Sequence, residues 1–175
     1  RWGRVSEGSG EDTYLGCRIA EAMVRGYQGP DKETQLTRDD QILACVKHFA
    51  LYGASEAGRD YNTVDMSRIR MYNDYFPPYK AAIEAGAAPV MTSFNDFNAI
   101  PASANEWLLK KLLKEELGFE GFVVSDYKAV TELIAHGVAA DAKEAAFKAL
   151  RAHLDMEMVT GTYLNHGEDL VSEGL

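Results

Sequence analysis

Residues 121–127 read Gly-Phe-Val-Val-Ser-Asp-Tyr, and this stretch decides the fold. An apolar run with two adjacent valines is typical of a buried strand, and here the run ends on an acid, Asp126. A carboxylate at the carboxyl end of a parallel strand lies where α/β proteins build their sites. The alternative is that Asp126 caps a following helix, because Asp is a favoured N-cap residue.

Two earlier segments share this design. Residues 42–46 (Ile-Leu-Ala-Cys-Val) lead into Lys47-His48-Phe49, and residues 89–94 (Pro-Val-Met-Thr-Ser-Phe) lead into Asn95-Asp96. Each is a short apolar strand that ends in polar residues. A last strand is predicted over residues 154–159. Helical spacing of apolar residues predicts helices over 67–86, 103–117, 127–136 and 141–153.

Local signals define two of these helices more closely. Pro77-Pro78 should kink or interrupt the helix over 67–86, because proline removes a backbone donor. Ser103, with Glu106 three residues later, has the pattern of a capping box at the start of the next helix, and Gly118 is placed to end it.

Strands that alternate with helices predict a parallel sheet covered by helices, an α/β fold. The polar residues at the strand ends would then converge at one mouth, which favours part of a (β/α)₈ TIM-type barrel. A doubly wound open sheet is the alternative. However, neither a Gly-rich phosphate fingerprint nor a P-loop follows any of these strands, which argues against nucleotide binding.

Several blocks together resemble glycoside hydrolase family 3. The opening Arg-Trp-Gly-Arg-Val-Ser-Glu-Gly-Ser-Gly-Glu-Asp (1–12) is similar to a signature that precedes a helix in that family. Lys-His-Phe (47–49), Gly-Arg-Asp-Tyr-Asn (58–62), Met-Thr-Ser-Phe-Asn (91–95) and residues 118–127 follow in the family's order, and Leu-Asp-Met-Glu-Met (154–158) fits a late barrel strand. The resemblance covers nearly the whole chain and is to the β-glucosidase and β-xylosidase branch.

The resemblance implies a role for individual residues. Asp126 matches the catalytic nucleophile, which forms a covalent glycosyl–enzyme intermediate. Six further residues match groups that bind or line the reacting sugar: Arg4, Lys47, His48, Arg59, Met91 and Tyr127. Tyr127 stands where many members have Trp, and Phe94 stands where a Tyr that hydrogen-bonds the nucleophile is frequent.

The residue types suit this chemistry independently of the family. A retaining glycosidase needs a carboxylate nucleophile and a second carboxyl as acid/base, roughly 5–5.5 Å away. Cations beside the nucleophile help to keep it ionised, and Arg and Lys donate charge-assisted hydrogen bonds to sugar hydroxyls. Taken singly, Lys47 and His48 could be a surface pair, and Arg4 and Arg59 solvated loop charges. For the four residues together, placement on the surface or in loops explains the pattern less well than a shared sugar-binding site does.

Composition excludes other classes of function. The net charge of −9 and the pI of about 4.9, with no basic stripe, argue against nucleic acid as a partner. No apolar run is long enough to span a bilayer, so no membrane partner is expected, and a periplasmic or secreted parent enzyme fits. Cys17 and Cys45 are interpreted as two free core thiols rather than a bridge. The four histidines show no metal-ligand spacing, and no cofactor is expected.

Length predicts an incomplete domain. A full (β/α)₈ barrel takes about 250 residues, whereas this chain has 175 and shows about four strands by pattern. We therefore expect residues 1–175 to be part of one catalytic barrel domain. The first strands, the end of the barrel and the second domain, which supplies the acid/base in relatives with this type of loop, would be absent. Self-association through open barrel edges would follow.

Function is therefore expected to be that of a retaining, exo-acting β-glycosidase that acts on terminal β-D-glucosyl or xylosyl residues of oligosaccharides or of aryl and alkyl glycosides. The loop 50–60 has no His, which argues against the branch that cleaves N-acetylglucosaminides. Glu56 and Asp60 are weaker candidates for a local acid. Two alternatives stay open: an inactive carbohydrate-binding or scaffold half-barrel, and a sugar phosphorylase of the same family.

Overall fold

The computed structural model describes residues 2–175, so Arg1, the first residue of the opening motif, lies outside the description. The helices are α1 (Thr13–Gln28), α2 (Arg68–Arg70), α3 (Phe76–Glu84), α4 (Ala129–Ala135), α5 (Ala142–Arg151) and α6 (Thr162–Ser172), with π-helical segments at Met71–Tyr75 and Trp107–Glu116. The strands are β1 (Val46–Phe49), β2 (Pro89–Thr92), β3 (Asp96–Phe97), β4 (Ile100–Pro101), β5 (Phe122–Tyr127) and β6 (Met156–Met158).

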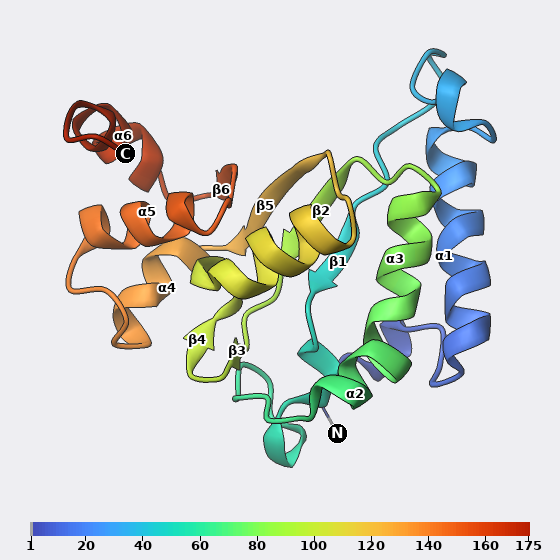
Figure 1. The fold of residues 1–175 in the computed structure, drawn as a ribbon, viewed down its shortest axis with the longest axis horizontal. Helices are drawn as coiled ribbons and strands as arrows, with labels where there is room; N and C mark the ends of the chain where they lie inside the picture. Colours follow the sequence, from blue (N-terminus) through green and yellow to red (C-terminus); the bar gives the residue numbers. More distant parts are fainter. Residues whose placement is uncertain (1) are drawn as a thin grey trace.

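A four-stranded parallel sheet forms the centre of the molecule, in the order β1-β2-β5-β6. Neighbouring strands follow one another along the chain, apart from the short β3–β4 hairpin, and helical segments connect them (Figure 1). The register pairs Val90 with Val123 and Met91 with Val124. This arrangement confirms the predicted α/β class and the parallel order of a (β/α) barrel segment.

The core lies between the sheet and its helices. Buried leucines of the Trp107–Glu116 segment pack with Val90 and Val123 of the central strands, and Phe49 of β1 joins the same cluster. A smaller cluster, which includes Val24 of α1 and Ala82 of α3, holds these two helices together at one end of the molecule, where they run side by side (Figure 1). The carboxyl ends of the strands are thereby fixed relative to one another.

The first strand begins later than predicted. Residues 42–45 are not in the sheet, because their backbone bonds go to the end of α1. The Ile42 amide donates to the Tyr27 carbonyl, and the Ala44 amide donates to the Gln28 side chain. Cys45 is consequently exposed and Cys17 only partly buried. Both thiols are free as expected, but their assignment to the core is wrong.

One helix start also differs from the prediction. The side chain of Asn105, not that of Ser103, caps the Trp107–Glu116 helix, by accepting from the Leu108 amide at 3.1 Å. Ser103 lies in a preceding turn, and its hydroxyl bonds that of Thr92 instead. Gly118, with a φ of 67°, follows the helix end as predicted.

The predicted interruption at Pro77-Pro78 is a change of helix type. The π-helical turn Met71–Tyr75 leads directly into α3, whose first positions hold proline. Proline has no amide hydrogen for the bond that a regular α-helical turn makes at these positions. The chain therefore forms a wider π-helical turn just before them.

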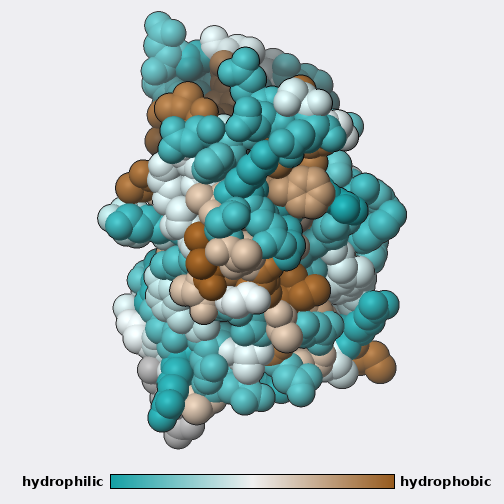
Figure 2. Space-filling view, turned by 90° about the vertical axis from the view of Figure 1, so that its left-hand side faces the viewer, coloured by the Kyte–Doolittle hydropathy of each residue, from teal (hydrophilic) through white to brown (hydrophobic). Residues whose placement is uncertain are grey.

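Hydrophobic side chains lie exposed at the α6 end of the molecule. Leu164 and Val171 of α6 and Val159 just before it are exposed, and brown patches interrupt the hydrophilic surface in the view from this side (Figure 2). Among residues 2–175, every helix is too short or too polar to cross a lipid bilayer.

Candidate active site

Asp126 occupies the carboxyl end of the central strand β5. Its Oδ1 accepts a hydrogen bond from the Tyr127 amide at 2.6 Å, and its Oδ2 lies 3.4 Å from Nε2 of His48. The side chain is 14% exposed, so one edge of the carboxylate is open. Lys128, rather than Asp126, takes the N-cap position of α4, and so the capping role is wrong.

His48 lies beside Asp126 at the end of β1. Its side chain is buried, and the ring packs edge-on against Tyr52, with centroids 5.3 Å apart. Burial lowers the pKa of His48, and the positive charge of Arg4 lowers it further, which together outweigh the opposite effect of Asp126. The imidazole is therefore a neutral partner of the carboxylate near neutral pH.

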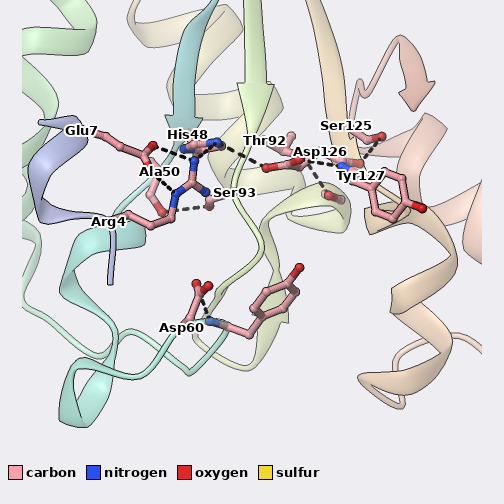
Figure 3. Close-up of polar contacts among 12 residues, drawn as sticks. Arg4, Glu7, His48, Ala50, Asp60, Thr92, Ser93, Ser125, Asp126 and Tyr127 are labelled. Atoms are coloured by element: carbon pink, nitrogen blue, oxygen red, sulfur yellow. Dashed lines mark hydrogen bonds and ion pairs between the residues drawn. The ribbon is translucent and has the colours of Figure 1, made fainter. Parts of the chain in front are cut away.

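Arg4 completes a row with His48 and Asp126 (Figure 3). Its guanidinium donates two hydrogen bonds to Glu7, at 2.9 and 2.8 Å, and its Nη2 lies 3.5 Å from His48 Nε2. This bidentate pair raises the pKa of Arg4 and lowers that of Glu7. Arg4 also lies over the Tyr52 ring, 5.6 Å from its centroid. Its planar fork is thus held in one orientation beside His48, which in turn contacts Asp126.

An aromatic wall, Trp2-Tyr52-Phe94-Tyr61, runs alongside this row. The ring centroids are 5.2 Å apart for Trp2 and Tyr52, 6.0 Å for Tyr52 and Phe94, and 4.3 Å for Phe94 and Tyr61. The first two contacts are edge-to-face, and the last is a stack. The Tyr52 hydroxyl is buried and has no hydrogen-bond partner among residues 2–175, and burial raises its pKa.

The other predicted site residues lie on these strands or on the loops that follow them, with different exposure. Met91 is half-buried on β2, one residue before its end, and Lys47 is exposed on β1. Tyr127 is exposed beside Asp126, and Arg59 lies exposed on the loop after β1. Asn95 is buried behind β2 and donates to the Ala50 carbonyl at 3.3 Å. The sugar-binding roles of these residues stay predictions.

A hollow of about 220 Å³ adjoins the row on the side of His48. Its lining includes Lys47, His48, Glu7 and Tyr52, with Tyr79 at the back. Tyr79 donates from its hydroxyl to the His48 carbonyl at 2.7 Å, which fixes the strand end at this point. Charged and aromatic groups thus share one concave region, and His48 is the lining residue that contacts Asp126.

Sequence reasoning missed three residues that shape the site. Glu7 holds Arg4, Tyr52 packs against both Arg4 and His48, and Tyr61 ends the aromatic wall. Glu7 was detectable, since it follows Arg4 by three residues within the opening motif. The two tyrosines lie on a loop that carried no periodic signal.

The chain as a whole is similar to known proteins. The profile "Glycosyl hydrolase family 3 N terminal domain" matches residues 1–174. The chain belongs to glycosyl hydrolase family 3. The recognised resemblance is therefore confirmed.

Relatives within family 3 include a periplasmic β-glucosidase of Salmonella typhimurium, which is 48% identical over 99% of this chain and 22% of that protein. A β-xylosidase of Formosa agariphila is 42% identical over 92% of the chain and 22% of that protein. The crystal structure of a β-glucosidase from Listeria innocua superposes with a TM-score of 0.94 at 49% identity, covering 99% of this chain and 24% of that one. The chain thus spans between a fifth and a quarter of the length of these family 3 relatives.

Proposed function

We propose that this chain supplies the nucleophile and the sugar-binding row of a retaining, exo-acting β-glycosidase. The observation that carries the proposal is the Asp126 carboxylate at the end of β5, open on one edge and lying 3.4 Å from a buried His48. Arg4, held by Glu7, adds a fixed positive charge to the same row. Membership of family 3, with β-glucosidases and a β-xylosidase among its relatives, supports the same reaction.

In the proposed first step, a carboxylate oxygen of Asp126 attacks the anomeric carbon of the terminal sugar. The bond to the leaving oxygen breaks as a proton reaches that oxygen from a general acid, and a glycosyl ester of Asp126 forms. In the second step water, deprotonated by the same group, attacks the anomeric carbon and releases Asp126. The configuration is retained because two displacements occur at one carbon.

The row also orients the carboxylate of the proposed nucleophile. The Tyr127 amide donates to Oδ1 and so fixes the plane of the carboxylate, without the hydroxyl that a Tyr at position 94 would supply. His48 contacts Oδ2, and Arg4 contributes positive charge beyond it. Arg4, Lys47 and Arg59 would donate to the sugar hydroxyls, which suits a terminal sugar held at a charged closed end.

The general acid is proposed to come from a segment of the whole protein outside residues 1–175. Asp60 and Glu56 are both exposed, and Asp60 is engaged by the Tyr61 amide at 3.0 Å. The acid must lie roughly 5–5.5 Å from Asp126, on the side of the leaving group. The relatives are four to five times longer than this chain and so contain further segments that can supply it.

The substrate is proposed to carry a terminal β-D-glucosyl or β-D-xylosyl residue. One structure of the Listeria innocua β-glucosidase is a complex with glucose, and another is a mutant in complex with laminaribiose. A periplasmic location is proposed by analogy with the relative from Salmonella typhimurium.

The test replaces Asp126 by Ala in a full-length protein that carries this chain. Turnover of p-nitrophenyl β-glucoside and β-xyloside should fall by a factor of about 10⁴ or more, and azide should restore part of it as the α-glycosyl azide. Asp39→Ala removes an exposed carboxylate before β1, serves as the matched control and should keep most of the activity. Near-normal turnover by the Asp126→Ala variant would refute the assignment, and binding without any wild-type turnover would favour a binding module.

A further inference from the structure

Tyr61 presents one face of its ring to solvent at the end of the aromatic wall. The other face stacks on Phe94, with centroids 4.3 Å apart and ring planes at 23°. Phe94 is only 8% exposed, whereas Tyr61 is 42% exposed. A tyrosine that is sandwiched on one side and open on the other has the form of a stacking platform.

The loop holds Tyr61 in this position at a conformational cost. Its φ of 65° lies in the left-handed region, which residues with a Cβ rarely adopt. Its amide donates to the Asp60 carboxylate at 3.0 Å, a contact drawn at Asp60 in Figure 3. Unusual backbone geometry of this kind concentrates at functional sites, because the surrounding structure must maintain it.

Tyr61 also lies within electrostatic reach of the nucleophile. Burial raises the pKa of Tyr61, and the negative charges of Glu132, Asp60 and Asp126 raise it further. Through Phe94 and Tyr52, its ring is continuous with the wall that packs against His48. The charged row and the exposed ring are thus two ends of one surface: a polar end at Arg4 and His48, and an apolar end at Tyr61.

We propose that the exposed face of Tyr61 binds the leaving group of the substrate and so determines specificity for it. The ligand would be an aryl ring, or the apolar face of a second sugar, attached to the sugar that Asp126 attacks. The charged end of the wall suits the hydroxyls of the terminal sugar, whereas the open aromatic end suits a flat group that leaves toward solvent. This inference rests on the proposed function.

The test compares two glucosides that differ only in their leaving group, in a full-length protein that carries this chain. For Tyr61→Ala, kcat/KM on p-nitrophenyl β-glucoside should fall about 3- to 10-fold, as expected for one lost aromatic stack. On β-glucosyl fluoride, whose leaving group is a single atom, it should change less than about 2-fold. Tyr61→Phe keeps the ring and should match the wild type within about 2-fold on both substrates.

A second variant tests whether the loss arises from the missing ring or from a disturbed loop. Tyr61→Asn should show the same discrimination as Tyr61→Ala, because Asn tolerates the left-handed backbone. Equal losses on both substrates in both variants, or no loss on the aryl glucoside, would overturn the inference. If the wild type showed no Asp126-dependent turnover of either substrate, the proposed function itself would fail, and this inference with it.

Discussion

His48 lies between a group that only donates and a group that only accepts. Its Nε2 is 3.5 Å from Nη2 of Arg4 and 3.4 Å from Oδ2 of Asp126. A single nitrogen of a neutral imidazole is either a donor or an acceptor. Arg4 already donates twice to Glu7, so we infer that Nε2 carries the proton and directs it to Asp126. His48 would then orient the Asp126 carboxylate without adding a charge.

The lowered pKa of His48 predicts how stability changes with pH. In the unfolded chain His48 takes up a proton near pH 6.5, whereas in the folded chain it does so only at a lower pH. The contribution of neutral His48 to the free energy of unfolding is therefore complete above pH 6.5, and it is lost as the pH falls toward the pKa of His48 in the folded chain. Chemical unfolding of a His48→Gln variant should lose less free energy than the wild type between pH 7 and pH 5.

A matched variant, His166→Gln on α6, separates this effect from the general loss of a histidine. It should retain the loss of stability at acid pH that His48 confers. Parallel curves for the wild type and for His48→Gln would show that His48 is not responsible.

Gly121 shows how closely two segments approach at the start of β5. A Cβ at this position would collide with the carbonyl oxygen of Ala88 and lie 2.7 Å from the Phe119 ring. The Phe122 amide donates to the same Ala88 carbonyl at 3.2 Å, so the backbone cannot retreat without breaking this bond. The glycine therefore sets the register of the strand that carries Asp126.

Replacement of Gly121 by Ala should destabilise the protein by about 1–3 kcal/mol or more, because the clash is with backbone. Gly167→Ala is the matched control. Gly167 lies within α6 with no atom near its Cβ position, so the same substitution should stabilise by about 0.5–1 kcal/mol. Thermal unfolding of both variants checks the prediction. A Gly121→Ala midpoint equal to that of the wild type would contradict it.

The elements that were predicted correctly are those whose secondary structure is indicated by adjacent residues. Residues 122–127 formed a strand as expected, since two adjacent valines and a terminal acid suffice to mark a buried strand. Residues 42–45 did not, because α1, distant in sequence, takes their backbone bonds. In the candidate site, Asp126, His48 and Arg4 came together as expected. Tyr61 was not foreseen, since its position depends on stacking against Phe94, which no spacing encodes.

At the scale of the whole molecule, the central sheet has two edge strands, β1 and β6. Within residues 2–175, β1 pairs only with β2 and β6 only with β5, so each has one edge without a strand partner. Exposed strand edges act as templates for association with other chains. Leu164, 88% exposed, and Val171 add an apolar surface at the same end as β6.

Residues 1–175 expressed alone should therefore self-associate and lack useful glycosidase activity. Light scattering after gel filtration should show species larger than 19.3 kDa that grow with concentration. Turnover of p-nitrophenyl β-glucoside should stay at the level of an Asp126→Ala control, because the proposed source of the general acid lies outside these residues. A stable monomer with robust, Asp126-dependent release of nitrophenol would contradict both expectations and make Glu56 and Asp60 the first candidates for the acid.

The order of strands in the sheet has a consequence for biosynthesis. Because β1, β2, β5 and β6 join the sheet in the order in which they occur in the chain, each emerging strand finds its partner already made. At about 5–20 residues per second, the ribosome releases β5 several seconds after β2. The strand that carries Asp126 can therefore dock on a nascent β1–β2 pair while translation continues.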